Sequence, residues 1–249
     1  MSTFCTVVLT STRQHWGLVD IDKITIDDTL SKSSLIKSSP KFIHIKTIVG
    51  DEEIALDKRK WFESRGFTVF ETIGNWKNDD ASHGTGLIED MAKIYNHPEV
   101  LKCDYVLHLE NDWRFNSENL DEELIYFINF LRLSPHIVYI RPTRIDQHDI
   151  IERLNGSCLN PSYKLFITNK EFSFNPFISR TRDMMYISSF VLKNKQGLNP
   201  HCEMAYEQAA KYLTNNNNIF VFFYNEIVEH LGSKEWCENY LKNNESKLR

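Results

Sequence analysis

Residues 104–115 read DYVLHLENDWRF, an apolar run that passes directly into two acidic residues and a tryptophan. Such a run is typical of a strand buried on both faces of a parallel sheet. The carboxyl ends of parallel strands border the crevice in which open α/β folds bind ligands. Residues two apart in an extended segment point to the same side, so we expect Glu110 and Asp112 to share one site and Asn111 to point away. Two carboxylates at this place suit Mg²⁺ or Mn²⁺; the alternative is an ordinary solvated acidic turn.

Short β-branched runs alternate with helical stretches on both sides of this segment. The pattern predicts strands at 4–10, 41–49, 67–73, 104–109, 136–141 and 219–223, with aromatic-rich strand candidates at 171–180 and 183–190. Helices are expected at 27–37, 54–65, 87–96, 120–133 and 202–213, and a polar loop at 74–86. The sequence contains no internal repeat or linker. We therefore predict one α/β domain over residues 1–249, with a mixed, mostly parallel central sheet flanked by helices.

The composition is that of an ordinary globular protein, with 249 residues, 41% hydrophobic and 25% charged. The net charge of −5 argues against a nucleic-acid-binding protein. The five cysteines are scattered without CxxC spacing, which suits a reducing compartment. No apolar run approaches the ~20 residues of a membrane span, and the first residues lack the basic start of a signal peptide. We expect a cytoplasmic protein without a membrane span.

The segment Asp104–Phe115 resembles the strand and acidic motif of GT-A-fold (Rossmann-like) glycosyltransferases. In that family a D-x-D motif, or a looser variant such as E-x-D, holds a divalent metal against the diphosphate of a nucleotide-sugar donor. The E-N-D of this chain departs from the strict motif, but other segments follow the family's order over most of the chain. The resemblance implies a nucleotide-sugar-binding half at 1–115 and an acceptor-binding half at 116–249. A narrower similarity, to the small soluble glycosyltransferases of large algal (chlorella) viruses that decorate capsid glycoproteins, implies a location in the host cytoplasm.

The resemblance also assigns site residues by position. Residues 4–13 match the first strand and nucleotide-binding turn, Asp51 matches a base-binding acid, and residues 82–86 match a segment that borders nucleotide and sugar. In the late segment 229–234 (EHLGSK), His230 matches a metal ligand that would join Asp112 and Glu110. The alternatives are a structural histidine at 230 and a surface lysine at 234. The donor-binding candidates are Thr10, Ser11, Thr12, Arg13, Asp51, Ser82, Gly86, Glu110, Asn111 and Lys234.

Direct displacement at an anomeric carbon needs a carboxylate base within hydrogen-bond reach of the acceptor hydroxyl. Glu203 and Glu207 follow a Gly-Leu-Asn-Pro turn, and their four-residue spacing puts them on one helical face. In inverting members of the resembled family a similar helix start carries the base. We favour Glu203, which is nearer the helix end; the alternative is that an acid there only stabilises the helix. The aromatic residues of 172–180 and Trp76 either fill the core or stack on acceptor sugars.

These features favour a metal-dependent, inverting glycosyltransferase that uses Mn²⁺ or Mg²⁺. It would move a hexose or pentose from a nucleotide-diphosphate sugar to a hydroxyl of a glycan or glycoprotein. A UDP-sugar is the donor that we expect. One alternative is a sugar nucleotidyltransferase, although residues 11–15 (STRQH) lack the glycines that such enzymes carry after the first strand. The other is a non-catalytic sugar-binding protein of the same fold. The sequence has no GxxxxGK[ST], GxGxxG, GxSxG or HExxH motif, which removes several common enzyme classes.

Overall fold

The computed structural model describes residues 3–12, 20–74, 80–143, 151, 156–160, 164–170, 172, 175–199, 201–215, 220–224, 227–231, 237–239 and 242. The strands are β1 (Phe4–Ser11), β2 (Lys41–Ile48), β3 (Phe67–Gly74), β4 (Tyr105–Glu110), β5 (Trp113–Phe115), β6 (Tyr139–Thr143), β7 (Ser157–Asn160), β8 (Leu165–Thr168), β9 (Phe177–Arg180), β10 (Phe220–Tyr224) and β11 (Val228–His230). The helices are α1 (Ile21–Lys32), α2 (Ser34–Ser38), α3 (Glu52–Glu63), α4 (Asp80–Tyr95), α5 (Pro98–Leu101), α6 (Leu120–Leu133), α8 (Thr181–Asn194) and α9 (Cys202–Leu213). Within these ranges no helix combines the length and the apolar character that crossing a membrane requires.

The described residues form a central nine-stranded sheet with the strand order β3-β2-β1-β4-β9-β6-β10-β8-β7. β1 pairs in parallel with β2 and β4, and β2 pairs in parallel with β3. β9 runs antiparallel to β4 and β6, so β6 and its parallel neighbour β10 keep the direction of β1. The predicted fold class, a mixed and mostly parallel α/β sheet flanked by helices, is confirmed. Because β1, β2 and β4 run side by side in one direction, their carboxyl ends lie at one edge of the sheet.

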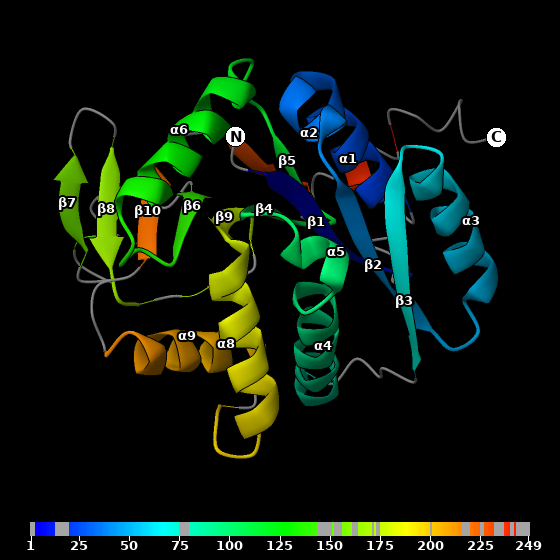
Figure 1. Cartoon of the computed structure of the whole chain (residues 1–249). Coiled ribbons are helices and arrows are strands. Elements are labelled where there is room, and N and C mark those ends of the chain that lie inside the picture. The colour runs from blue at the N-terminus through cyan, green and yellow to red at the C-terminus, as the bar shows by residue number, and fades with distance from the viewer. Residues whose placement is uncertain are drawn as a thin grey trace.

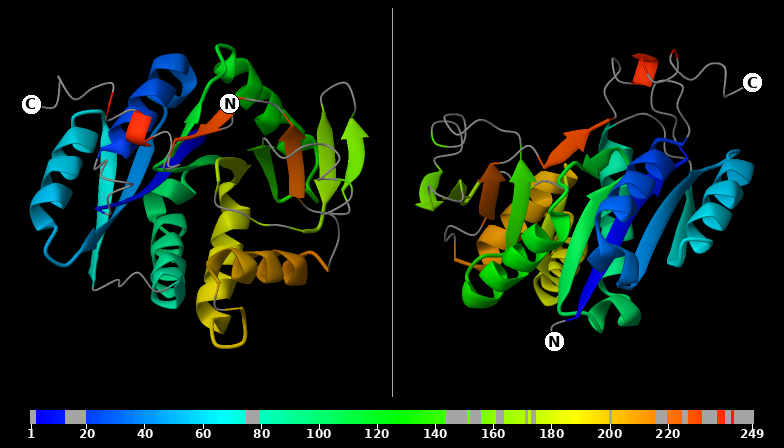
Figure 2. Two further views of the ribbon diagram at one scale, coloured as in Figure 1. Left: turned by 180° about the vertical axis from the view of Figure 1, so that it is seen from behind. Right: turned by 90° about the horizontal axis from the view of Figure 1, so that it is seen from above.

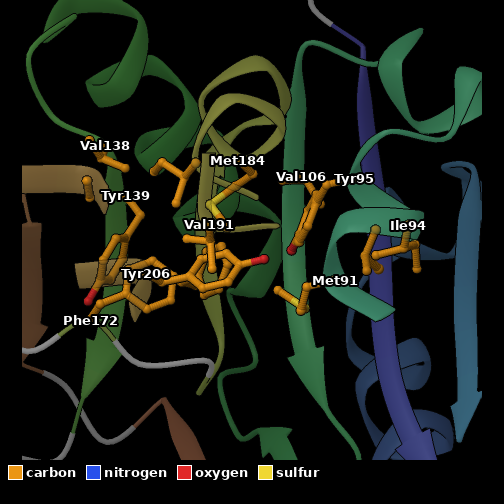
Figure 3. Packing of buried hydrophobic residues seen from close by; sticks show 14 of the residues in the cluster. Met91, Ile94, Tyr95, Val106, Val138, Tyr139, Phe172, Met184, Val191 and Tyr206 are labelled. Atoms are coloured by element: carbon orange, nitrogen blue, oxygen red, sulfur yellow. The ribbon is translucent and has the colours of Figure 1, made fainter. Parts of the chain in front are cut away.

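Helices cover both faces of this sheet and enclose two apolar cores. On one face α4, α8 and α9 lie together and contact one another (Figures 1 and 2). Figure 3 shows side chains from these helices, among them Met91, Met184 and Tyr206, meeting side chains from the strands in the first core. α1, α3 and α6 pack on the opposite face. Successive side chains of a strand point to opposite faces of the sheet, so β1 contributes to both cores. Val7 lies in the first core and Val8 in the second.

Residues 183–190, which the sequence predicts as a strand, lie in helix α8 instead. Its buried residues include Met184, Ile187, Ser188 and Val191, which have the i, i+3, i+4, i+7 spacing of one helical face. The aromatic and β-branched residues of this segment favoured a strand. Because the buried residues recur with the period of a helix, the segment forms a helix despite this preference.

Helices α1 and α4 begin well before the positions that the sequence predicts. α1 begins at Ile21 rather than at residue 27, because its buried face includes the polar residues Asp22, Thr25 and Thr29, which hide the apolar period. It ends at Lys32, and the Ser33 side chain then caps the separate helix α2. α4 begins at Asp80, so part of the expected polar loop at 74–86 is helical.

Candidate active site

A cavity of about 250 Å³ opens at the carboxyl ends of β1, β2 and β4. Five of its lining residues are donor-binding or metal-ligand candidates from the sequence, and the others come from β1, β2 and α4. The lining residues are Leu9, Thr10, Ser11, His44, Lys46, Leu87, Asp90, Glu110, Asn111 and Asp112. The structure thus brings the first-strand turn and the acidic motif together at the edge where an open α/β sheet binds its ligand.

The acidic motif turns instead of continuing as an extended strand. β4 ends at Glu110, and Asn111 and Asp112 form a turn before β5 begins. The extended geometry from which Asn111 was expected to point away is therefore absent, and Asn111 also lines the cavity. Its backbone oxygen accepts a hydrogen bond of 2.8 Å from Oγ1 of Thr25, which ties the turn to α1.

His230 lies beside Asp112, and Nε2 of its ring is 3.0 Å from Oδ2 of that carboxylate. Two short antiparallel strands hold this arrangement, since β11 pairs with β5 and places His230 opposite Trp113. The two rings are 5.0 Å apart between centroids, and the Leu231 N–H donates to the Asp112 carbonyl at 2.7 Å. The structure thus brings together two of the three predicted metal ligands.

Glu229 fixes β11 against β5. Its carboxylate accepts hydrogen bonds from Arg114 (Nε at 3.0 Å and Nη2 at 2.8 Å) and from Nδ2 of Asn116 at 2.8 Å. Arg114 also forms an ion pair with Asp28 of α1. These contacts restrict the backbone that carries His230, which lowers the entropy lost when its ring binds a ligand.

Glu110, the third predicted metal ligand, faces Asn175 and Arg141. In the amide orientation that satisfies both neighbours, Nδ2 of Asn175 donates to Oε2 of Glu110 at 3.2 Å, and Oδ1 accepts from Nη2 of Arg141 at 2.6 Å. Burial raises the pKa of Glu110 from 4.5 to about 8, and the negative charges of Asp112 and Glu203 act in the same direction. The positive charge of Arg141 opposes this shift. Glu110 is therefore mostly protonated at neutral pH in the metal-free chain.

The two candidate bases differ in their surroundings. Glu203 lies in the first turn of α9, and its negative charge acts on Glu110. Glu207, one turn later, forms an ion pair with Lys211 and accepts a hydrogen bond of 3.3 Å from the Phe172 N–H. Glu207 thus pairs within α9 and ties the helix to Phe172, whereas the charge of Glu203 acts on the acidic motif. This difference favours Glu203 as the base.

Threonine hydroxyl groups at the end of β1 and just after it make contacts within the protein. Thr10 donates to Oδ2 of Asp22 at 2.7 Å, and both oxygens of that buried carboxylate are 2.7 Å from Nζ of Lys58. Thr12 donates to Oδ2 of Asp51 at 2.9 Å and accepts from the Ile48 N–H at 3.0 Å. The Thr12 hydroxyl therefore positions Asp51 at the start of α3.

Several sequence candidates fall outside the site or outside the described residues. Arg13, Lys234 and Trp76 belong to the segments that the structure does not describe. Ser82 and Gly86 lie in the first half of α4, where only the backbone is described. Of the aromatic residues in the segment 172–180, Phe172 and Phe177 are buried in the first core.

The described residues fit a divalent ion that a bound diphosphate would complete. Among them, no three His, Cys, Asp or Glu side chains form a ready metal cluster. The Asp112–His230 pair nevertheless suits two neighbouring positions of an octahedral ion, because ligands about 2.1 Å from an ion and at right angles lie about 3 Å apart. Such ions take their remaining ligands from phosphates and water, and the imidazole ligand is compatible with Mn²⁺.

Comparison with known proteins supports the fold assignment. No protein-family model and no curated protein matches this sequence. The nucleoside-diphosphate-sugar pyrophosphorylase from Vibrio cholerae RC9 is 13% identical with a TM-score of 0.53, covering 95% of this chain and 99% of that one. The 4-diphosphocytidyl-2C-methyl-D-erythritol synthase from Anaerococcus prevotii is 12% identical with a TM-score of 0.52, covering 99% and 97%. The chain has a Rossmann-like, GT-A-type fold. At these identities the likeness does not select an activity.

A more distant structural match is a mannosyltransferase from Pyrobaculum calidifontis, solved in complex with GDP-Man and Mn²⁺. It is 8% identical with a TM-score of 0.49, and the alignment covers 86% of this chain and 53% of that one.

Five polar residues of the site were not identified from the sequence: His44, Lys46, Asp90, Arg141 and Asn175. For three of them a signal existed. His44 and Lys46 are basic residues that alternate with the apolar residues at 43 and 45 of β2, and Arg141 likewise follows a buried apolar run. A charged residue in a strand covered on both faces needs a partner or a ligand. Asp90 and Asn175 carry no such signal, because their neighbours are set by the tertiary fold.

The raised pKa of Glu110 predicts how the stability of the metal-free protein depends on pH. Between 4.5 and about 8 the folded chain holds a proton on Glu110 that the unfolded chain has released. The free energy of unfolding therefore falls as pH rises through this range and levels off above it. Glu110→Gln mimics the protonated carboxyl, so we expect its melting temperature to match that of the unmodified protein near pH 4.5 and to exceed it at pH 8. Parallel pH profiles for the two proteins in chelator would contradict this prediction.

Proposed function

We propose that this protein is a metal-dependent glycosyltransferase that moves a sugar from a nucleotide-diphosphate sugar to an acceptor hydroxyl with inversion. The observation that carries the proposal is the Asp112–His230 pair just after β4, with Asp112 and Glu203, at a helix start, both acting electrostatically on Glu110. Metal-ligand groups and a separate carboxylate base are the two components that direct displacement at an anomeric carbon requires.

In the proposed reaction Glu203 removes the proton from the acceptor hydroxyl as its oxygen attacks the anomeric carbon of the donor sugar. The bond from that carbon to the diphosphate oxygen breaks, and the nucleoside diphosphate leaves with the electron pair. Attack from the face opposite the leaving group inverts the anomeric configuration. A divalent ion held by Asp112 and His230 would neutralise the charge that develops on the leaving diphosphate. Asn175 and Arg141 orient Glu110 beside this pair.

The position of Glu203 is less suited to nucleotidyl transfer, the principal alternative. The nucleophile of that reaction is a phosphate oxygen, which is already ionised and needs no base. A carboxylate such as Glu203 near the acidic motif would repel it. An acceptor hydroxyl, in contrast, must lose a proton, and a carboxylate near the reaction centre assists it.

A direct assay separates the candidate functions. Purified protein with Mn²⁺ is incubated with a panel of UDP- and GDP-sugars, and slow release of nucleoside diphosphate is measured. A parallel reaction supplies UTP or CTP with sugar 1-phosphates and measures pyrophosphate. Metal-dependent release of nucleoside diphosphate supports the transferase, and pyrophosphate release would replace it with the nucleotidyltransferase. Nucleotide-sugar binding without either product would indicate a sugar-binding protein.

His230→Ala is expected to weaken Mn²⁺ affinity by at least about 10–100-fold, a range known for the loss of groups that only support metal ligands. The fold should be retained, because the His230 side chain is 43% exposed. Isothermal titration with Mn²⁺ in the presence of UDP measures the effect. His136→Ala, at an exposed turn, is the matched control. Identical Mn²⁺ titrations for His230→Ala and the unmodified protein would assign His230 to structure alone.

The finer assignments rest on the sequence resemblance. UDP as the nucleotide, a glycan or glycoprotein as the acceptor, and decoration of a viral capsid glycoprotein in a host cytoplasm stay predictions. The nucleotide panel tests the first of them directly.

A further inference from the structure

The cavity contains a second polar group, which neither the metal-ligand pair nor the base uses. It consists of His44 and Lys46 of β2 and Asp90 of α4. All three are buried, with 2%, 6% and 2% of their surface exposed. Burying a charged or polar side chain costs free energy unless a partner or ligand compensates it.

Only one of the two carboxylate oxygens of Asp90 has a hydrogen-bond partner among the described residues. Its Oδ1 accepts a hydrogen bond of 2.9 Å from Thr72 and lies 3.5 Å from Nε2 of His44. Its Oδ2 is buried and has no hydrogen-bond partner in the described structure. Thr72 and His44 therefore fix the carboxylate while one acceptor oxygen stays available beside the cavity. Such unmatched buried acceptors are uncommon in native proteins and call for an explanation.

Lys46 supplies the compensating positive charge. Burial lowers its pKa, and attraction to Asp90 opposes that effect. Burial also lowers the pKa of His44, so its ring is neutral near pH 7 and adds no charge. The cavity lining thus contains an ammonium donor and a carboxylate acceptor whose charges interact, together with the acidic motif.

We propose that Asp90 and Lys46 bind two neighbouring hydroxyl groups of the transferred sugar, Asp90 accepting from one and Lys46 donating to the other. The proposal rests on the proposed function and adds the substrate class: a neutral sugar with a free vicinal diol. A sugar that carries a carboxylate at this place would meet the negative charge of Asp90, and a sugar lacking the hydroxyl that donates to Asp90 would leave its buried Oδ2 without a partner among the described residues.

The test measures binding instead of turnover. Affinities for UDP and for UDP-glucose, UDP-galactose, UDP-xylose and UDP-glucuronate are determined by titration with Mn²⁺ present, and GDP and GDP-mannose are compared in the same way. For the sugar that binds best, Asp90→Asn should weaken binding of the nucleotide-sugar by about 10–100-fold, the effect of losing a hydrogen bond to a charged group. It should leave the affinity for the free nucleoside diphosphate unchanged. Glu89→Gln is the matched control, because Glu89 is an exposed neighbour on α4.

A second arm uses the unmodified protein, so it does not depend on the folding of a variant. Deoxy analogues of the preferred donor remove one hydroxyl at a time. Binding should weaken about 10-fold or more for two adjacent positions only, and UDP-glucuronate should bind more weakly than UDP-glucose.

Two results would overturn the inference while sparing the proposed function: equal weakening of the nucleotide and nucleotide-sugar in Asp90→Asn, or tolerance of every single hydroxyl deletion by the unmodified protein. Absence of any nucleoside diphosphate binding with Mn²⁺ would instead overturn the proposed function and this inference with it.

Discussion

Asp112→Asn is expected to reduce sugar transfer by about 10³-fold or more while the fold is retained. The substitution removes the charge without changing the volume, and the amide oxygen can still accept from the ring of His230. A neutral amide holds a divalent ion weakly, so the leaving diphosphate loses several kcal/mol of charge stabilisation. Each ~1.4 kcal/mol corresponds to a tenfold change in rate. Initial rates at saturating Mn²⁺, together with the melting temperature, measure the two parts of this expectation.

Asp57→Asn is the control for Asp112→Asn, because it removes one carboxylate from the exposed surface of α3. A second readout concerns Glu110, whose pKa is raised in part by the charge of Asp112. Removal of that charge should lower the pKa of Glu110 and shift the pH profile of stability toward lower pH. Full transfer activity in Asp112→Asn, or in the unmodified protein with excess chelator, would refute the metal-dependent mechanism.

The sequence could predict those parts of the site that depend only on a short, local pattern of residues. An apolar strand running into two acids places carboxylates at the edge of a parallel sheet whatever the rest of the chain does. Glu110 and Asp112 therefore followed from a short stretch of residues. The sheet itself followed from the alternation of β-rich and helical runs.

The remainder depends on contacts between distant segments. His230 was a candidate only through the family resemblance, because it reaches Asp112 across 118 positions through the pairing of β11 with β5, which neither three-residue strand signals alone. The pKa of Glu110 is set by Asp112, Glu203 and Arg141, which different elements supply. Helix α1 was misplaced because Asp22 is buried against Lys58 and Thr10, a pairing that a single helix cannot reveal. In each case the deciding neighbour is distant in sequence.

Glu203→Gln is expected to retain donor binding and to lower transfer by about 10²–10⁴-fold, the usual contribution of a positioned general base. Glutamine keeps the size of the side chain and can still hydrogen-bond to the acceptor, but it cannot take up the proton. The loss should therefore appear in kcat rather than in the donor KM, because proton removal matters only in the transition state. Steady-state kinetics with varied donor at saturating acceptor separate the two constants.

Glu207→Gln is the matched control on the same face of α9. Its carboxylate pairs with Lys211 and accepts from the Phe172 N–H, so its replacement should lower the melting temperature slightly and leave kcat near that of the unmodified protein. The two variants together distinguish the possible outcomes. If Glu207→Gln loses transfer and Glu203→Gln keeps it, helix α9 carries the base one turn later than we propose. If both keep near-normal kcat, neither residue is the base and the mechanism proposed for this helix is wrong. A loss confined to Glu203→Gln, with unchanged donor KM, is the result that the coupling between Glu203 and the acidic motif predicts.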